Sequence, residues 1–277
     1  MNPRHIVLLF IAVFAVSWAA ILVRLSGAPG IACALWRMIF SALILLILSL
    51  KSVPYELRRL SRRDLLELAI PGITLALHFS LWMESLYHTT IAVSTTIVCT
   101  HPIYSTITVY LKLREKPGKM QIIGFILALT GVSLLYTATD RSSTIQAGNH
   151  QSGVLLALAG AITGGIYFGY GRTLRTRIPL KTYTLTVYTI AALTLLPIAI
   201  AIKTSITSYP LRAWIAFTLL ALVPMMLGHN ILNYLLRYHK AITVTSAILG
   251  EPVGATILAA IIFHETPITI TTYTGIT

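Results

Sequence analysis

The chain has 277 residues, of which 56% are hydrophobic and only 10% are charged. Soluble domains are usually about 45–50% apolar and about 25% charged, so the composition excludes a soluble enzyme, a secreted disulfide scaffold and a disordered chain. The net charge of +13 would suggest nucleic acid as a partner of a soluble protein. Membrane proteins, however, gather Lys and Arg in their cytoplasmic loops. We therefore expect a lipid bilayer, and no nucleic acid, as a partner.

Nine continuous apolar runs predict membrane-spanning helices, because a bilayer core accommodates roughly 20 apolar residues in a helix. A transmembrane β-barrel would instead show short segments of alternating polarity. A tenth run begins at Ile268 and stops at Thr277. The sequence thus predicts an all-α, polytopic membrane protein. In chain order the nine runs are 6–25, 31–50, 65–87, 91–113, 120–136, 153–171, 182–202, 211–236 and 241–263.

The distribution of positive charge predicts the orientation. If the N-terminus lies in the cytoplasm, sixteen of the 21 Lys and Arg residues fall on the cytoplasmic side and four on the other side, with Arg37 inside the second run. This bias follows the positive-inside rule. We therefore expect a multi-pass protein of the cytoplasmic cell membrane with its N-terminus in the cytoplasm.

A polar stretch at 137–152 separates two halves, a first repeat at 1–136 and a second repeat at 153–277. A shift of 150 residues places His101-Pro102 on Glu251-Pro252. Five runs is an odd number, so the second half enters the membrane in the opposite orientation, as in many secondary transporters. The prediction is a ten-helix bundle of two five-helix inverted repeats.

The same shift places the fifth run on 269–286, beyond the end of the sequence at Thr277. We therefore expect the tenth helix to be truncated in this sequence and the native chain to continue. The alternative is a nine-span protein with an apolar stub.

Several stretches resemble the EamA-type permeases of the drug/metabolite transporter superfamily. Residues 76–82 and His101-Pro102 resemble the first repeat of that family, and 228–230 and 249–255 resemble the second. Glu84 departs from the pattern, since relatives more often have a small or apolar residue there. The resemblance implies transport of small metabolites, often export, and does not specify the substrate.

Ionisable residues inside apolar runs are costly and mark a cavity or a partner. Glu251 and His101 each lie ten residues into a run, about 15 Å deep at 1.5 Å per residue, which is near the midplane. We interpret both as a proton or substrate site; the alternative for Glu251 is a structural hydrogen bond to a neighbouring helix. Arg37 could hold a substrate carboxylate or phosphate. Its alternatives are a structural pair with Glu84 or snorkelling to the headgroups.

Further polar and aromatic residues follow helical spacing. His78 and Trp82 share one face of the third run, which could line a cavity or simply pack. Asn230 and Asn233, with Tyr234 and Arg237, form a polar stripe that must face protein or water. Trp18 and Tyr104 are additional candidates for the pathway. The paired glycines at 160/164 and 165/169 predict close packing between helices.

The leading hypothesis is a secondary transporter that exports small metabolites by alternating access, coupled to protons through Glu251. It is not expected to be an enzyme, and no catalytic residue, cofactor or metal is predicted, because the familiar nucleotide-binding and hydrolase motifs are absent from the sequence. Three alternatives stay open: a multi-pass membrane enzyme with Glu251 and His101 as acid and base, a carrier of lipid-linked substrates, and a non-transporting scaffold. The sequence does not predict an oligomeric state.

Overall fold

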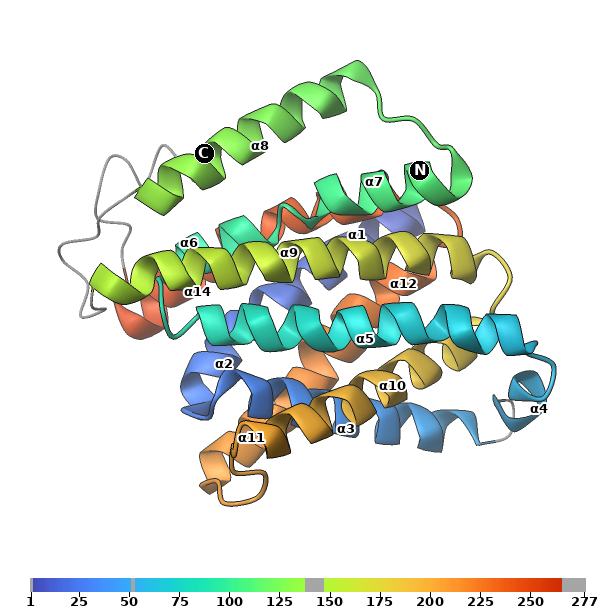
Figure 1. The fold of residues 1–277 in the computed structure, drawn as a ribbon, viewed down its shortest axis with the longest axis horizontal. Helices are drawn as coiled ribbons and strands as arrows, with labels where there is room; N and C mark the ends of the chain where they lie inside the picture. The colour runs from blue at the N-terminus through green and yellow to red at the C-terminus, as the bar shows by residue number, and fades with distance from the viewer. Residues whose placement is uncertain (1, 51–52, 138–146, 266–277) are drawn as a thin grey trace.

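The computed structural model describes residues 2–50, 53–137 and 147–265, and every regular element within these ranges is a helix (Figure 1). Eight helical segments of the described chain are long and apolar enough to cross a membrane. The fourth predicted run, residues 91–113, is not among these eight, because it is divided into two shorter helices. The expectation of an all-α, polytopic protein is therefore confirmed.

The described part of the first half contains eight helices, of which α1 and α2 together form the first span. Their bounds are α1 (Pro3–Ser17), α2 (Ala19–Ser26), α3 (Gly30–Ser49), α4 (Val53–Leu57), α5 (Arg62–Ser85), α6 (Ile91–Val98), α7 (His101–Leu113) and α8 (Lys119–Thr137). The short α4 lies in a connection and was not expected from hydropathy, because five residues are far too few to span a bilayer.

The second half begins with the long α9 and contains two non-α segments, the π-helical η1 and the 3₁₀ turn η2. Its elements are α9 (Ala147–Arg175), α10 (Leu180–Ala201), α11 (Leu211–Leu220), η1 (Ala221–His229), α12 (Asn230–Leu235), α13 (Ala241–Ala247), η2 (Ile248–Gly250) and α14 (Glu251–Phe263). Because α9 starts at Ala147, residues 147–152 of the expected polar linker are helical. The tenth run lies outside the described residues.

Two spans are interrupted at positions related by the shift of 150 residues. The helix is broken between α6 and α7 just before His101, and it tightens into η2 just before Glu251. Pro102 and Pro252 occupy the second position of α7 and α14. A proline is tolerated there because the amide N–H of that position has no partner within the helix. As a result, His101 and Glu251 are each the first residue of a helix inside a span.

Helix α9 packs between α5 and α7 (Figure 1). Two glycine pairs permit this close approach on two different faces. A Cβ added at Gly160 would lie 3.2 Å from the Cβ of Trp82 on α5. One added at Gly164 would lie 2.6 Å from the ring of His78 on the same helix. A Cβ added at Gly165 would lie 2.8 Å from the carbonyl oxygen of His101 on α7. The packing expected from the glycine spacing is thus confirmed.

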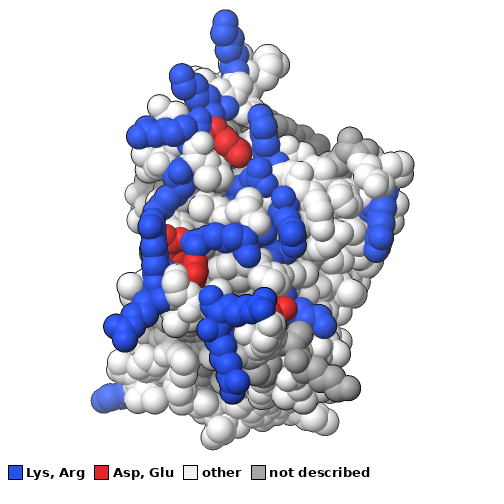
Figure 2. Space-filling model, turned by 90° about the vertical axis from the view of Figure 1, so that its right-hand side faces the viewer, with Lys and Arg blue, Asp and Glu red and all other residues white. Residues whose placement is uncertain are grey.

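The positive charges gather at one end of the bundle. The α7–α8 and α9–α10 connections and α4 meet at this end (Figure 1), and Figure 2 shows many Lys and Arg side chains over it with few acidic ones. Some of this charge is paired: Arg177 forms ion pairs with Asp64 and Glu67, and Arg172 lies 3.4 Å from Glu115. The charge asymmetry of the sequence is therefore also an asymmetry of the folded protein.

Candidate functional site: a buried polar cavity between the helices

A small cavity lies among the spans from both halves of the chain. Its volume is about 20 Å³, enough for a single water molecule. Polar side chains from five spans converge on it, and small or aliphatic residues complete the wall. The lining residues are Val16, Ala19, Arg37, His78, Trp82, Val98, Cys99, His101, His229, Ile248 and Glu251.

Local departures from regular α-helix position several of these side chains. His101 and Glu251 stand at the two helix starts created by the interrupted spans. His229 is the last residue of η1, a π-helical stretch that contains Pro224. Proline removes a backbone donor, and π-helical turns are frequent at functional sites. Irregular backbone is therefore concentrated around this cavity.

Arg37 is completely buried and has no hydrogen-bond partner in the part of the chain that the structure describes. Its exposed fraction is 0%, and Nε, Nη1 and Nη2 all lack an acceptor. The guanidinium lies 4.0 Å from the centre of the Phe79 ring, a cation–π contact. Glu84 accepts a hydrogen bond from the backbone N–H of Gly30 at 3.0 Å instead of pairing with Arg37. The Arg37–Glu84 pair and the snorkelling arginine, both considered from the sequence, are wrong.

Glu251 is also buried, with 7% of its surface exposed. The thiol of Cys99 approaches its Oε2 at 3.8 Å, a long and weak contact for a carboxylate. Within the described residues, neither Glu251 nor Arg37 belongs to an ion pair. The cavity thus contains a guanidinium and a carboxyl group that do not form a salt bridge with each other.

The remaining polar groups of the cavity are ring nitrogens. The Nδ1–H of His78 donates to the carbonyl oxygen of Gly160 at 2.8 Å, which orients that ring. Nδ1 of His101, Nδ1 of His229 and Nε1 of Trp82 have no hydrogen-bond partner among the residues described. The Phe168 ring lies 5.0 Å from the His101 ring and 5.7 Å from the His229 ring, so it packs beside both. Buried polar atoms are normally hydrogen-bonded, and this concentration of unpartnered nitrogens distinguishes the site.

Comparison with known proteins identifies the family. The sequence model of the EamA-like transporter family matches residues 4–137 and 151–277. The chain belongs to the EamA-like transporter family. A curated relative from Clostridium kluyveri, described as an uncharacterized transporter, is 23% identical over 234 residues, covering 82% of this chain and 74% of the relative. A protein of known crystal structure shares the fold, with a TM-score of 0.71, 16% identity, and coverage of 99% of this chain and 93% of that one.

Membership of the EamA-like transporter family makes this chain a multi-pass membrane transporter with a lipid bilayer around it and a small-molecule substrate. The family and the name of the relative point to a transporter rather than an enzyme. Among the described residues, no group of three His, Cys, Asp or Glu side chains is arranged to hold a metal ion.

Of the residues expected along the pathway of this EamA family member, five line the cavity: Arg37, His78, Trp82, His101 and Glu251. Four do not line it: Trp18, Tyr104, Asn230 and Asn233. Asn233 is fully buried and donates from Nδ2 to the hydroxyl of Tyr167 at 2.5 Å, so it ties α12 to α9.

Sequence reasoning missed His229 and Cys99 as cavity residues. The α-helical periodicity that grouped Asn230 with Asn233 does not extend back through the π-helical η1, so it gave no reason to choose His229. The only signal for His229 was its place in the 228–230 stretch that resembles the family. Cys99 is adjacent to the break before His101, where helical spacing also fails.

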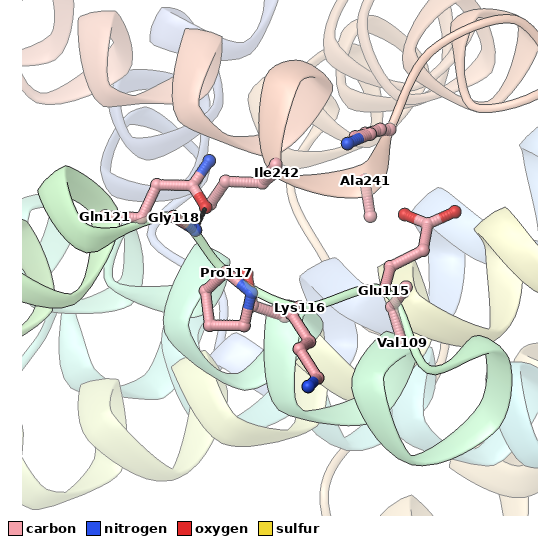
Figure 3. A pocket seen from close by; sticks show the side chains of 10 residues that line it. Val109, Glu115, Lys116, Pro117, Gly118, Gln121, Ala241 and Ile242 are labelled. Carbon is pink, nitrogen blue, oxygen red and sulfur yellow. Dashed lines mark hydrogen bonds between the residues drawn. The ribbon is translucent and has the colours of Figure 1, made fainter.

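A second, larger pocket of about 280 Å³ lies at the basic end (Figure 3). It lies between the α7–α8 connection, with Glu115 to Gly118, and the start of α13 at Ala241 and Ile242. None of its lining residues has a buried, unpartnered polar side-chain atom. The central cavity is therefore the candidate site in this EamA family member, and the larger pocket belongs to the end of the bundle.

Proposed function

We propose that this protein is a secondary transporter of small metabolites that works by alternating access, with the central cavity as its substrate site. The observation that carries this proposal is the pair of buried, mutually unpaired groups Arg37 and Glu251. An uncompensated buried charge costs several kcal/mol. Ionisable groups retained in spans at such a cost usually mark substrate or ion pathways.

A pseudo-symmetric architecture supports alternating access. The two segments that match the family are close to the proposed repeats, 1–136 and 153–277. Helices α6 and α13 start at 91 and 241, and α7 and α14 run over 101–113 and 251–263, each shifted by 150 residues. Arg114 and His264, which follow α7 and α14, both adopt left-handed backbone conformations with φ of 59° and 55°. We propose an inverted pair of five-helix repeats.

A difference between the two ends of the bundle also supports alternating access. At one end, Glu265 accepts a hydrogen bond from the backbone N–H of Ile91 at 2.6 Å. The shift of 150 residues relates this pair to Glu115 and Ala241. At the basic end, these two residues face the 280 Å³ pocket (Figure 3), and Glu115 pairs with Arg172 instead. This difference supports an arrangement in which the end at Ile91 is closed and the basic end is looser.

The direction and the energy source are further parts of the proposal. The basic end in Figure 2 is assigned to the cytoplasm by the positive-inside rule, with the protein in the cytoplasmic membrane and its N-terminus inside. Export is the direction implied by the resemblance to the family. Glu251 is the carboxyl group of the cavity and therefore the group through which protons would be coupled to transport.

The test is release of metabolites from vesicles. Purified protein is reconstituted into liposomes loaded with a defined equimolar mixture of small carboxylates, phosphate esters, amines and sugars. Mass spectrometry then measures each compound inside and outside. We expect selective release that vesicles without protein do not show, with the total of each compound unchanged. Retention of all compounds would contradict transport, and chemical conversion of one of them would favour the membrane enzyme.

A further inference from the structure

We propose that the substrate carries a carboxylate or phosphate group and that Arg37 binds this group. The inference rests on the proposed transport function and specifies the chemistry of its substrate. It starts from the buried N–H donors of the cavity that have no hydrogen-bond partner among the described residues.

The donors are concentrated on Arg37. A guanidinium has five N–H groups in a planar fork that matches a carboxylate or phosphate with two parallel hydrogen bonds. All three nitrogens of Arg37 are buried and unpartnered. The indole N–H of Trp82, a donor only, is unpartnered in the same cavity. A ligand rich in acceptor oxygens would satisfy these atoms, whereas a cationic or purely apolar ligand would leave them unsatisfied.

Among the described residues, no acidic side chain forms an ion pair with the guanidinium. Glu251 is the only acidic residue among the lining residues, and it forms no ion pair with Arg37. Beneath the guanidinium lies the Phe79 ring at 4.0 Å, which holds the plane of the fork without using its N–H groups. The fork is thus oriented and buried while its donors stay free for a ligand.

A structural role and a ligand-binding role for Arg37 predict different effects on stability. If Arg37 were half of a buried charge pair, its removal would strongly destabilise the protein. If it has no partner, its removal relieves the cost of burying a charge. Arg37→Gln should therefore leave the melting temperature of the purified protein unchanged or raise it. A residue kept for its ligand contributes to function at the expense of stability.

The experiment uses the full chain in liposomes loaded with succinate, glycerol 3-phosphate, alanine, choline, putrescine and glucose. For the wild type we expect release of one or more compounds that contain a carboxylate or phosphate, and the first three probes show which group is accepted. Arg37→Gln should slow that release roughly ten- to hundredfold, the loss expected for a charge-assisted hydrogen bond. Arg37→Lys keeps the charge without the fork and should fall in between.

Arg58→Gln provides the matched control, because it is the same substitution at an exposed position that does not line the cavity. It should retain downhill release of the anion. Release by the wild type of choline, putrescine or glucose alone would overturn the inference and leave the transport function intact. Undiminished release in Arg37→Gln, or an equal loss in Arg58→Gln, would also overturn it. If the wild type releases none of the probes or of the wider mixture, the proposed function itself fails.

Discussion

Replacing Gly165 by Ala should force α9 and α7 apart. The new Cβ would lie 2.4 Å from the Cβ of Tyr104 and 2.8 Å from both the carbonyl oxygen of His101 and the backbone nitrogen of Ser105. Carbon atoms prefer separations of about 3.5–4.0 Å. Two of the three neighbours are backbone atoms, so side-chain rotation cannot relieve the contact. The helices must therefore separate by about 1 Å, and such overpacking typically costs about 1–3 kcal/mol.

Gly124→Ala is the matched control, because a Cβ at Gly124 on α8 would have no other atom within 4 Å. Alanine favours a helix over glycine by about 1 kcal/mol, and this gain is common to both variants. The difference in free energy of unfolding between them therefore isolates the steric cost of about 1–3 kcal/mol. At about 2–4 °C per kcal/mol, Gly165→Ala should melt about 2–12 °C below Gly124→Ala.

The assay is thermal unfolding of each purified variant in the same detergent, followed by size-exclusion chromatography with fluorescence detection. Gly165→Ala should also slow transport, since His101 at the start of α7 moves with its helix. Equal melting temperatures for the two variants would refute the close α9–α7 packing on which the position of His101 depends.

Three further predictions concern ionisable groups. Glu251→Gln should abolish substrate accumulation driven by a pH gradient in proteoliposomes while keeping downhill exchange of the substrate. Full gradient-driven accumulation by this variant would show that Glu251 does not couple protons to transport. Glu265→Gln weakens the hydrogen bond that caps the backbone N–H of Ile91. Hydrogen exchange of that amide should therefore become at least several-fold faster. Unchanged exchange would contradict the proposal that Glu265 closes this end of the bundle. Burial, and to a lesser extent the nearby His5, lowers the pKa of His239 from its ordinary value of about 6.5. The unfolded chain therefore binds a proton at this histidine more readily than the folded chain does. The stability of the fold should fall as the pH drops below about 6.5. His239→Gln should reduce that fall in melting temperature, and an identical pH profile would exclude His239 as its cause.

The spans could be predicted from the sequence because a bilayer requires a continuous apolar run whatever the tertiary packing. The interrupted helices could be anticipated as well, since Pro102 and Pro252 each remove a backbone donor inside a run. The same reasoning selected His101 and Glu251, which do line the cavity.

What the sequence could not provide is the partner of each polar side chain. The stripe with Asn233 showed that a polar face needs protein or water, but not that Tyr167 on α9 would accept a hydrogen bond from its Nδ2. His229 was missed because the π-helical η1 shifts the facing of residues relative to an α-helix. Arg37 could be placed in a span from sequence, but its lack of a partner is a property of the packed bundle alone.

The most direct test of the account is the accessibility of Cys99. The chain has two cysteines, so Cys33→Ala leaves Cys99 as the single thiol, buried in the cavity with 1% of its surface exposed. A membrane-impermeant methanethiosulfonate reagent is applied to sealed, oriented vesicles, either outside or trapped inside. Alternating access predicts modification of Cys99 from both sides, and none when Cys99 is also replaced by Ala. If Cys99 stays unmodified from both sides while the vesicles still release metabolites, the central cavity is not the transport site.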